Sequence, residues 1–335
     1  MTAKRGFLLG KFMPPHRGHL FLCKTALEMV DELTVLVCST SADDMPGALR
    51  HQWMNAALPR ATVLHLDRDL PQEPDDHPDF WPIWREAIGE VHPQAVDYVF
   101  GSEPYLFRLA EELDAEAVLV DPERDMFPVS GTAIRKNPAA HWFDIAPPAR
   151  PYFQKRLCLL GPESTGKSRL ARILTRHFKT LCMPEYGRTY DIHYKQGENW
   201  REEDLLTLAQ THTAMRVALA PDAGPLLIED TDAIQTAIWA EFLLGAPSPL
   251  LESFVEKKPL ADCYFVLSPD VRWIDDGVRY AGDDDTRRWF FDAALSRLKT
   301  LDLEPHIIDG ADWPARTGEA MDIADRLFGD YRARD

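Results

Sequence analysis

Two short segments of this sequence have the residue types and spacing that bind phosphate groups. The first is His16-Arg17-Gly18-His19, which follows the apolar run at residues 6–12. The second runs from Gly161 to Ser168 and follows the apolar run at 156–160. Each lies where a strand is expected to pass into a helix, and backbone N–H groups gathered at a helix N-terminus favour an anion. Two different segments of this kind predict two nucleotide-dependent reactions on one polypeptide.

The two histidines of the first segment are three residues apart at a helix start, which places both imidazoles on one side of the first turn. Gly18 leaves room for a phosphate to approach the backbone. A further segment, residues 129–135, opens another helix with a hydroxyl-rich turn and carries Arg135, which predicts a second anion site with a cation. The alternatives are two surface histidines and a plain helix N-cap.

The second segment matches the Walker A pattern G-x4-G-K-S in full. In this pattern backbone N–H groups hold the β- and γ-phosphates, Lys167 adds a positive charge and the Ser168 hydroxyl reaches Mg²⁺. The apolar strand before it and the helical pattern after it are the context that the motif requires.

Carboxylates follow two later strands of the same half of the chain. Asp230 and Asp232 end the apolar run at 225–229, and Asp230 is the candidate for Mg²⁺ binding or for a general base. Glu185 ends the strand after the Walker A helix and could accept the proton of a substrate hydroxyl. The alternatives are a helix N-cap, which fits Asp232 better than Asp230, and an ion pair between Glu185 and Arg188.

Residues 273–279 and the pair Arg287 and Arg288 resemble the mobile lid of small-molecule kinases. Arginines in such a lid close over the transferring phosphates. Exposed helix charge is the alternative for Arg287 and Arg288.

Length and composition predict an ordinary globular protein with two domains. The chain has 335 residues, which is long for one core, and 45% hydrophobic and 27% charged residues are typical values. No apolar run approaches the roughly 20 residues of a membrane span, and the start of the chain lacks the features of a signal peptide. The net charge of −17 argues against non-specific nucleic-acid binding, which needs a basic surface.

The five cysteines contain no C-x-x-C pair and sit mostly in apolar runs. They are therefore expected to be buried thiols of a reducing compartment, which predicts a cytoplasmic protein without a structural zinc site.

Strand and helix patterns alternate along both halves of the chain. In the first half we expect strands at 6–12, 33–38, 61–66, 95–100 and 117–120 and helices at 18–30, 81–90 and 104–113. In the second half we expect strands at 156–160, 181–184, 226–229, 263–267 and 306–308 and helices at 167–179, 202–219, 232–244, 286–299 and 313–328. The alternation predicts an α/β protein with two doubly wound parallel sheets.

Three prolines between residues 146 and 151 are not expected to continue a helix or a central strand, and they predict a linker. The predicted domains are therefore residues 1–147 and 152–335.

The H-x-G-H and S-G-T-x-I-R segments together resemble the nucleotidylyltransferase superfamily. The resemblance implies in-line attack of a phosphate on the α-phosphate of ATP, with pyrophosphate as the leaving group. His16 and His19 would hold ATP phosphates, and Lys11 and Arg135 would neutralise the departing pyrophosphate. Mg²⁺ would bridge the phosphates.

Nearly the whole chain resembles the NadR-type bifunctional nicotinamide mononucleotide adenylyltransferase/ribosylnicotinamide kinases. The segments that carry this resemblance are G-K-F-x-P-x-H-x-G-H at 10–19, W-x-x-W at 81–84, V-D-P-x-R at 120–124, S-G-x-x-I-R-x-N-P at 130–138, G-x-E-S-x-G-K-S at 161–168, E-Y-G-R at 185–188, D-T-D at 230–232 and D-D-G-x-R at 275–279. It implies an N-terminal Rossmann-like nucleotidylyltransferase domain and a C-terminal P-loop kinase domain.

The same resemblance implies two consecutive steps of NAD salvage. The C-terminal domain would phosphorylate nicotinamide riboside to the mononucleotide (NMN) with ATP and Mg²⁺, and the N-terminal domain would then add AMP to form NAD. The residues implied to bind ATP are Gly10, Phe12, Gly18, Asp121, Arg124, Ser130, Gly131, Ile134, Gly161, Glu163, Ser164, Thr165, Gly166, Ser168, Arg279 and Arg287. The residues implied to bind the nicotinamide substrates are Trp81, Trp84, Tyr186, Arg188 and Asp232.

Trp84 and Tyr186 would stack on the nicotinamide ring, each in its own domain, because a cationic ring gains from an aromatic face. Ordinary core packing is the alternative for each. Some members of the family carry an N-terminal helix-turn-helix; here the first strand begins at about residue 6, so we expect neither that domain nor DNA binding. The oligomeric state stays open, a homo-oligomer included.

Two other functions remain to be compared with this one. A kinase/adenylyltransferase fusion for another vitamin, such as a riboflavin or pantetheine derivative, is disfavoured by the two ring-stacking aromatics. A non-enzymatic sensor of ATP and NAD is disfavoured by intact Lys167, His16, His19 and Arg135.

Overall fold

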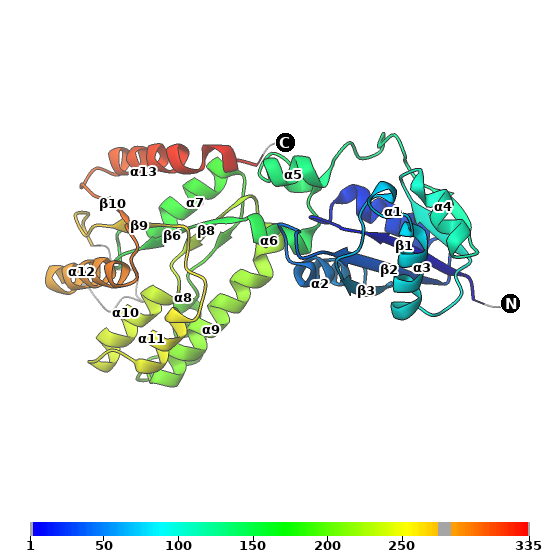
Figure 1. Ribbon diagram of the computed structural model, residues 1–335. Helices are drawn as coiled ribbons and strands as arrows, with labels where there is room; N and C mark the ends of the chain where they lie inside the picture. The colour runs from blue at the N-terminus through cyan, green and yellow to red at the C-terminus, as the bar shows by residue number, and fades with distance from the viewer. Residues whose placement is uncertain (1–2, 274–282, 334–335) are drawn as a thin grey trace. The chain divides into compact units, whose positions relative to one another are not determined.

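The computed structural model describes residues 3–273 and 283–333. The chain divides into two compact units, Met1–Tyr152 and Phe153–Asp335, and the described residues of each form a five-stranded sheet (Figure 1). Neighbouring strands are parallel throughout both sheets. The predicted fold class of two doubly wound parallel sheets is confirmed.

In unit 1 the strand order is β3-β2-β1-β4-β5. The strands are β1 (Arg5–Gly10), β2 (Glu32–Ser39), β3 (Thr62–Asp67), β4 (Tyr98–Gly101) and β5 (Glu116–Leu119), and the helices are α1 (Arg17–Leu27), α2 (Gly47–Ala57), α3 (Phe80–Val91), α4 (Tyr105–Glu112) and α5 (Gly131–Lys136). After β1 the chain adds β2 and β3 on one side of β1, and it then adds β4 and β5 on the other side. In doubly wound sheets such a reversal opens a crevice at the carboxyl ends of the strands, where ligands bind.

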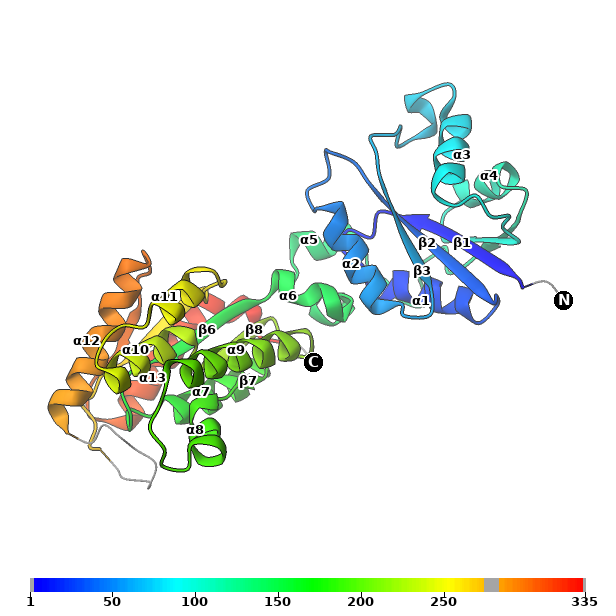
Figure 2. The same ribbon diagram turned by 90° about the horizontal axis from the view of Figure 1, so that it is seen from below.

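Alternation along β1 builds the two cores of unit 1. Phe7 and Leu8 are both fully buried, but successive side chains of a strand point to opposite faces of the sheet. Phe7 packs with residues of α3 and α4, whereas Leu8 packs with residues of α1 and α2. Figure 2 shows these two helix pairs on opposite sides of the sheet.

In unit 2 the strand order is β10-β9-β6-β8-β7, so β6 is central. The strands are β6 (Lys155–Leu160), β7 (Cys182–Met183), β8 (Leu226–Asp230), β9 (Cys263–Leu267) and β10 (His306–Ile308). The helices are α7 (Lys167–Phe178), α8 (Tyr186–Tyr190), α9 (Glu202–Leu219), α10 (Ala233–Leu244), α11 (Pro249–Glu256), α12 (Asp284–Thr300) and α13 (Trp313–Phe328). The reversal point lies at β6, directly before the Walker A segment.

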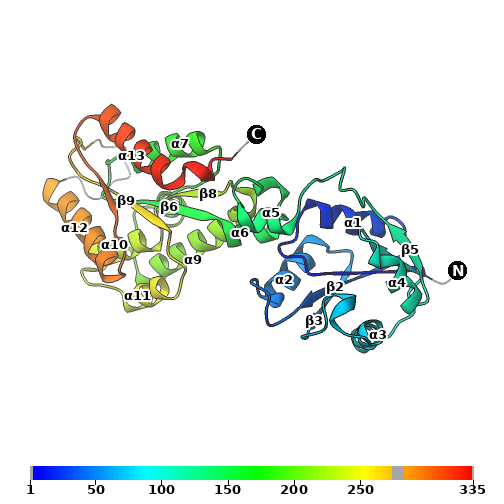
Figure 3. The same ribbon diagram turned by 45° about the horizontal axis from the view of Figure 1, so that its top comes forward.

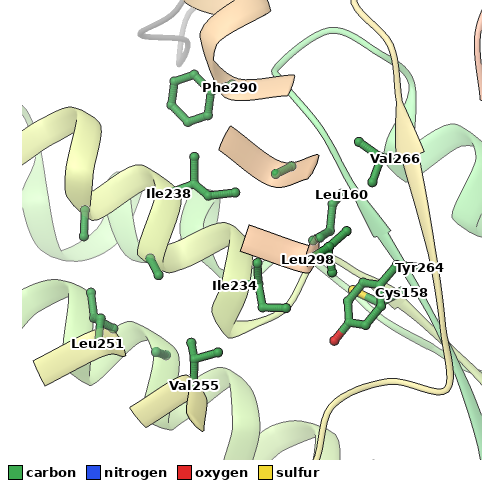
Figure 4. Packing of buried hydrophobic residues seen from close by; sticks show 14 of the residues in the cluster. Cys158, Leu160, Ile234, Ile238, Leu251, Val255, Tyr264, Val266, Phe290 and Leu298 are labelled. Atoms are coloured by element: carbon green, nitrogen blue, oxygen red, sulfur yellow. The ribbon is translucent and has the colours of Figure 1, made fainter. Parts of the chain in front are cut away.

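The two faces of the second sheet are covered unequally. Leu159 packs in the cluster that includes residues of α7 and α13, and Leu160 packs in the larger cluster formed with α9, α10, α11 and α12. Figures 1 and 3 show where these helices lie. Figure 4 shows Ile234, Leu251 and Phe290 of this larger cluster on one side of the strand residues. The helices of this thicker layer supply much of the wall of the cavity described below.

Several elements differ from the sequence-based expectations, among them helices α2, α8 and α11, which were not predicted. Helix α2 was not predicted, because its buried residues include the charged Arg50 beside Trp53 and Met54, which breaks the apolar periodicity. The expectation that the prolines at 146–151 exclude helix is wrong. Pro147–Ala149 forms a 3-10 turn and Arg150–Phe153 forms α6, because a proline within the first turn removes no helical hydrogen bond.

All five cysteines are free, and four of them are buried, with Cys182 partly exposed. Burial raises the pKa of the Cys23 and Cys38 thiols to about 12, so both stay protonated. In the part of the chain that the structure describes, no helix is long and apolar enough to cross a membrane.

Candidate active sites

The H-x-G-H segment lies at the carboxyl end of β1, where α1 begins. His16 is the N-cap of α1 and is buried, with an exposed fraction of 7%. Its ring stacks on the ring of His19, with centroids 3.6 Å apart and planes inclined by 25°. A Cβ on Gly18 would lie 3.2 Å from the His16 ring, so glycine keeps the imidazole close to the backbone.

Hydrogen bonding defines the protonation of this histidine pair. The His16 backbone N–H donates to His19 Nδ1 over 3.3 Å, which leaves Nε2 as the protonated nitrogen of a neutral His19. Burial, followed by the charge of Arg124, lowers the pKa of His16 to about 4, and burial also holds the pKa of His19 well below 6.5. Near neutral pH each ring therefore offers one N–H to an anion and carries no charge.

The S-G-T segment is in direct contact with the turn that precedes His16. A Cβ on Gly131 would lie only 2.5 Å from the Met13 carbonyl oxygen, and Arg135 donates from Nη1 to the same carbonyl. Ser130 caps α5 by accepting from the Ala133 N–H over 3.1 Å. The structure thus brings the two predicted anion segments of unit 1 together.

Arg50, which the sequence reading missed, stabilises the segment between β1 and His16 by hydrogen bonds to backbone carbonyls. Its guanidinium is fully buried and donates to the carbonyls of Lys11 and Cys38. It also pairs with Asp43 over 2.6 Å, and Asp43 in turn pairs with Lys11 Nζ over 3.1 Å. The signal in the sequence is weak: a lone arginine in a helix that lacks clear periodicity.

Several other predicted ATP ligands of unit 1 have structural roles for their side chains. Phe12 is buried and meets the His19 ring edge-on at 5.0 Å, and Ile134 is fully buried, so only their backbones can contact a nucleotide. Asp121 accepts hydrogen bonds from the backbone N–H groups of residues 125 and 126. Arg124 pairs with Glu103 over 3.5 Å. Gly10 is the last residue of β1, Gly18 lies in the first turn of α1 and Gly131 is the first residue of α5.

The two tryptophans implied to bind the mononucleotide lie on α3. Trp81 and Trp84 are half-buried and pack against the core on the Phe7 face of the sheet. Trp84 also donates from Nε1 to the Pro71 carbonyl over 2.9 Å. Core packing therefore accounts for part of each ring, and part of each remains accessible.

Unit 2 contains a cavity of about 580 Å³ at the carboxyl end of β6. The Walker A residues 163–169 form one wall, and residues 184–188, which include Glu185, Tyr186 and Arg188, form another. The remaining lining comes mainly from α9 and α10. The cavity brings together the predicted phosphate segment, the predicted carboxylates and the predicted ring-stacking tyrosine.

The backbone of the Walker A segment adopts positive φ angles at its two glycines. Gly161 and Gly166 adopt φ angles of 134° and 87°, and a Cβ on them would lie 2.6 Å from the Leu267 carbonyl oxygen and 2.1 Å from the Trp313 ring. Lys167 is buried, and its ammonium donates to the carbonyls of Gly161 and Pro162, both over 2.9 Å. The charged group is therefore already held inside the phosphate loop.

Asp230 is the buried carboxylate of this site. Burial, followed by the charge of Glu185, raises its pKa to about 6, although Lys167 and a hydrogen bond from Ser168 act in the opposite direction. Its Oδ1 is buried and has no hydrogen-bond partner among the described residues. A carboxylate oxygen without a partner, next to a serine hydroxyl, is the donor chemistry that Mg²⁺ prefers.

Asp232 does not line the large cavity, and the N-cap alternative describes it better than the implied role in substrate binding. Its Oδ1 accepts from the Ile234 N–H over 2.9 Å at the start of α10, and its Oδ2 accepts from the Tyr264 hydroxyl over 2.8 Å. Both oxygens are therefore engaged inside the fold.

The lid arginines fall into two groups. Arg279 lies outside the described residues. Arg287 is buried and donates to the Val271 carbonyl over 2.9 Å, so the alternative of exposed helix charge does not hold for it, whereas Arg288 is exposed. Arg287 does not belong to the residues that line the large cavity.

The cavity also contains side chains that the sequence reading did not single out. Trp200, Trp239 and His212 line it, and Gln235 accepts the Gly161 N–H over 3.0 Å. Trp200 precedes α9, and Trp239 lies within α10. In the sequence each tryptophan is read as an ordinary core residue. No motif distinguishes them before the helices are placed against the sheet.

Comparisons with known families match one family to each unit. Residues 7–137 match the cytidylyltransferase-like family, and residues 156–316 match the AAA domain family. The first match contains both anion segments of unit 1, and the second contains the Walker A segment and Asp230. A nucleotidylyltransferase-like unit followed by a P-loop unit is the predicted order.

Among curated proteins the chain is similar to the trifunctional NAD biosynthesis/regulator protein NadR of Escherichia coli (strain K12). The identity is 26% over 352 residues, which cover 98% of this chain and 84% of that protein. It is similar to the protein of the same name from Salmonella typhimurium, with 26% identity over 97% of this chain and 83% of that protein.

Two crystal structures share the fold along nearly the whole chain. One is a NadR protein in complex with NR, with a TM-score of 0.73 and 21% identity over 99% of this chain and 97% of that one. The other is a NadR protein in complex with NAD and AMP-PNP, with a TM-score of 0.74 and 22% identity over 100% and 98%. At this level of identity the likeness shows a common fold.

Proposed function

We propose that this chain, whose resemblance to the NadR proteins extends over 98% of its length, is a bifunctional enzyme of NAD salvage. Unit 2 transfers a phosphoryl group from ATP to nicotinamide riboside and gives NMN. Unit 1 transfers AMP from ATP to NMN and gives NAD and pyrophosphate. The observation that carries the proposal is that, in each unit, residues of the predicted phosphate-binding segments lie together with other predicted site residues of the same unit. The relatives' complexes with NR, NAD and AMP-PNP support the choice of substrates.

The kinase reaction follows from the groups around the large cavity. Lys167 and the N–H groups at the start of α7 hold the ATP phosphates. The riboside lies along residues 184–188, where Glu185 accepts the proton of the attacking hydroxyl and Tyr186 contacts the nicotinamide ring. Glu185 and Asp230 both line this cavity, so both carboxyl groups are placed at one proposed reaction centre.

Mg²⁺ is the metal proposed for both reactions. In unit 2 Ser168 and the unpartnered Oδ1 of Asp230 would hold it, because a small hard cation prefers oxygen ligands. When bound, it neutralises charge on the phosphate oxygens. Asp230 is thus assigned to the metal and Glu185 to the proton.

The adenylyl-transfer reaction in unit 1 needs no general base. The attacking oxygen belongs to the phosphate of the mononucleotide, which is already ionised near neutral pH. His16 and His19 are neutral and each donates one N–H, while Lys11 and Arg135 supply positive charge for the departing pyrophosphate. Positioning and charge stabilisation therefore suffice for the transfer.

The domain limits and the compartment are part of the proposal. We assign the adenylyl-transfer domain to residues 1–147 and the kinase domain to 152–335, close to the division of the two compact units after Tyr152. The free thiols support a reducing compartment such as the cytoplasm, and the net charge of −17 speaks against a nucleic-acid partner.

One incubation tests the proposal directly. Purified protein is supplied with ATP, Mg²⁺ and nicotinamide riboside, and the products are separated by chromatography over time. NMN is expected first and NAD after it, and NMN added alone with ATP and Mg²⁺ should give NAD. An incubation in which nicotinamide riboside is not phosphorylated, while a flavin or pantetheine substrate is, would replace the proposed substrate.

A further inference from the structure

His212 is a buried histidine to which the proposed kinase mechanism gives no role. It lies on α9 with an exposed fraction of 5%. It lines the cavity of about 580 Å³ together with Pro184 and Glu185. It also lines a second cavity of about 20 Å³ that is surrounded largely by charged side chains, among them Arg156, Arg216, Glu229 and Asp232. His212 is therefore the side chain that connects the reaction cavity with a buried charged network.

The hydrogen bonds of His212 define its tautomer. The ring lies beside Pro184 at the cavity wall, and the backbone of Pro184 favours the protonated ring; because proline has no N–H, the group that acts on the ring is its carbonyl oxygen. Nε2 has no partner in residues 3–273 and 283–333, so Nδ1 is the donor. Burial keeps the pKa of His212 below 6.5, so the ring is neutral near neutral pH. Nε2 then carries a lone pair that requires a donor.

Glu229, on β8, presents a second acceptor to the same small cavity. Its Oε1 is bound by Arg156, and Arg216 Nε lies 3.9 Å from Oε2, which is beyond hydrogen-bond distance. Oε2 is buried and has no hydrogen-bond partner among the described residues. The two unpartnered atoms, His212 Nε2 and Glu229 Oε2, are both acceptors, so neither can satisfy the other. Both oxygens of Asp232 are already engaged.

We propose that one buried water occupies the small cavity and donates its two hydrogens to His212 Nε2 and Glu229 Oε2. A water molecule needs about 10–15 Å³ of cavity volume, and the cavity of about 20 Å³ has room for one. Two acceptors that line one void can both be paired by a molecule with two donors, so that each buried group has a partner.

The water gives His212 a function in the kinase reaction. Fixed at Nε2, the imidazole holds the Pro184 carbonyl through Nδ1, and Pro184 is followed directly by Glu185 and Tyr186 at the cavity wall. His212 is thus a positioning residue that places the proton acceptor and the ring contact for the riboside. This role rests on the function proposed above.

Substitutions in the full-length protein test the positioning role. His212→Phe keeps a flat ring but removes both hydrogen bonds, and it should lower kcat/KM for nicotinamide riboside about 10–100-fold, as displacement of reacting groups does. The KM for ATP and the rate of AMP transfer to NMN should not change. His212→Asn should restore a large part of the loss, because its amide can donate to Pro184 as Nδ1 does. His193→Asn, at an exposed site in the π-helical segment Asp191–Lys195, is the matched control.

Two results would overturn the positioning role: a folded His212→Phe protein with unchanged riboside kinetics, or an Asn variant as impaired as the Phe variant. A crystal structure of the full-length protein that resolves ordered water tests the bridge itself. Density within hydrogen-bond distance of both atoms is expected, and a dry cavity would refute it. A wild-type protein that does not phosphorylate nicotinamide riboside would refute the proposed function. The crystal structure tests the water independently of that result.

Discussion

The two proposed phosphate sites of this chain differ in their electrostatics. In unit 1 the groups closest to the helix start are His16 and His19, which burial keeps neutral. In unit 2 they are the ammonium of Lys167 and the carboxyl groups of Asp230 and Glu185, which line one cavity. The proposed site of unit 1 combines neutral N–H donors with the cations Lys11 and Arg135, whereas that of unit 2 combines one cation with two carboxyl groups in a cavity.

The difference follows from what each proposed reaction asks of the protein. AMP transfer uses a nucleophile that is already an anion, so neutral donors that position it without changing its charge are sufficient. Phosphorylation of a riboside starts from a neutral hydroxyl, so the site must remove a proton, and it needs carboxylates for the proton and for Mg²⁺. Burial and, after it, the charge of Glu185 disfavour the ionised form of Asp230, which is why its pKa is raised.

The strongest way to break this comparison is to remove one site and measure the other. Lys167→Ala should lower riboside phosphorylation by about 10²–10³-fold or more, because a preorganised charge at the phosphates is lost. AMP transfer to added NMN should stay intact. His19→Ala should have the reverse effect, and both rates can be measured on the same preparation.

Loss of both activities from either substitution, in a protein that still shows cooperative unfolding, would mean that the two reactions share a site. The assignment of one reaction to each unit would then be wrong. His193→Asn, at an exposed position in unit 2, is the matched control for both variants.

A second prediction concerns the free energy of unfolding, which the buried carboxyl group of Asp230 lowers. The folded pKa of Asp230 is about 6 against 3.8 for the ordinary carboxyl. Between these values the folded protein binds the proton that the unfolded chain has released, so stability falls as the pH rises through this window. A shift of about two units is worth about 3 kcal/mol at pH 8. Without Mg²⁺ and nucleotide, Asp230→Asn should therefore raise the free energy of unfolding by up to that amount while phosphorylation is lost.

Denaturant titration at pH 8 and at pH 4 provides the measurement. The gain should shrink at pH 4, where Asp230 is protonated in the wild-type protein. The control Asp222→Asn changes an exposed carboxylate and should shift stability by less than about 0.5 kcal/mol. A gain of the same size at both pH values would show that the charge of Asp230 is not the cause.

Unit 1 should respond to pH with the opposite sign. The pKa of His16 is lowered from 6.5 to about 4 by burial and by Arg124, so the folded protein favours the neutral ring. Its contribution to stability is complete above pH 6.5 and is lost as the pH falls toward 4. At pH 5 the loss of unfolding free energy is about 2 kcal/mol, because pH 5 lies about 1.5 pH units below the unfolded pKa and each unit is worth about 1.4 kcal/mol.

The difference in unfolding free energy between the wild-type protein and His16→Ala isolates this effect. That difference should be about 2 kcal/mol smaller at pH 5 than at pH 7.5, since the variant has no histidine at this position to protonate. A difference that does not vary with pH would show that His16 is not kept neutral by its surroundings, and the contrast between the two sites would lose its basis.

The sequence predicted the sheets and both phosphate segments because their signals are local. Apolar runs mark the buried parallel strands, and a phosphate loop depends on a few residues at a strand–helix junction, such as Gly161, Gly166 and Lys167. The expected strands match the observed ones to within a few residues.

What the sequence could not predict depends on contacts between distant segments. Arg50 acts through the carbonyls of Lys11 and Cys38, to which no local pattern points. Trp200 and Trp239 line the cavity only because α9 and α10 pack on the same face of the sheet. Asp232 was assigned to the substrate by its place in a D-T-D motif, but a hydrogen bond from the distant Tyr264 shows it to be engaged within the fold.

Trp84 offers the smallest and most discriminating test, because family resemblance and packing assign it different roles. A cationic nicotinamide ring gains about 0.5–2 kcal/mol from an aromatic face, which corresponds to about a 3–30-fold effect. Trp84→Ala should raise the KM for NMN by this factor in the transfer of AMP and leave the KM for ATP unchanged. Trp84→Phe should recover much of the loss, because it restores an aromatic face. The Phe variant lacks the hydrogen bond from Nε1 to the Pro71 carbonyl, and this loss should lower the stability of the protein without changing the KM for NMN. If both variants lose stability equally while their NMN kinetics stay normal, Trp84 belongs to the core of unit 1, and the mononucleotide must find its ring contact elsewhere.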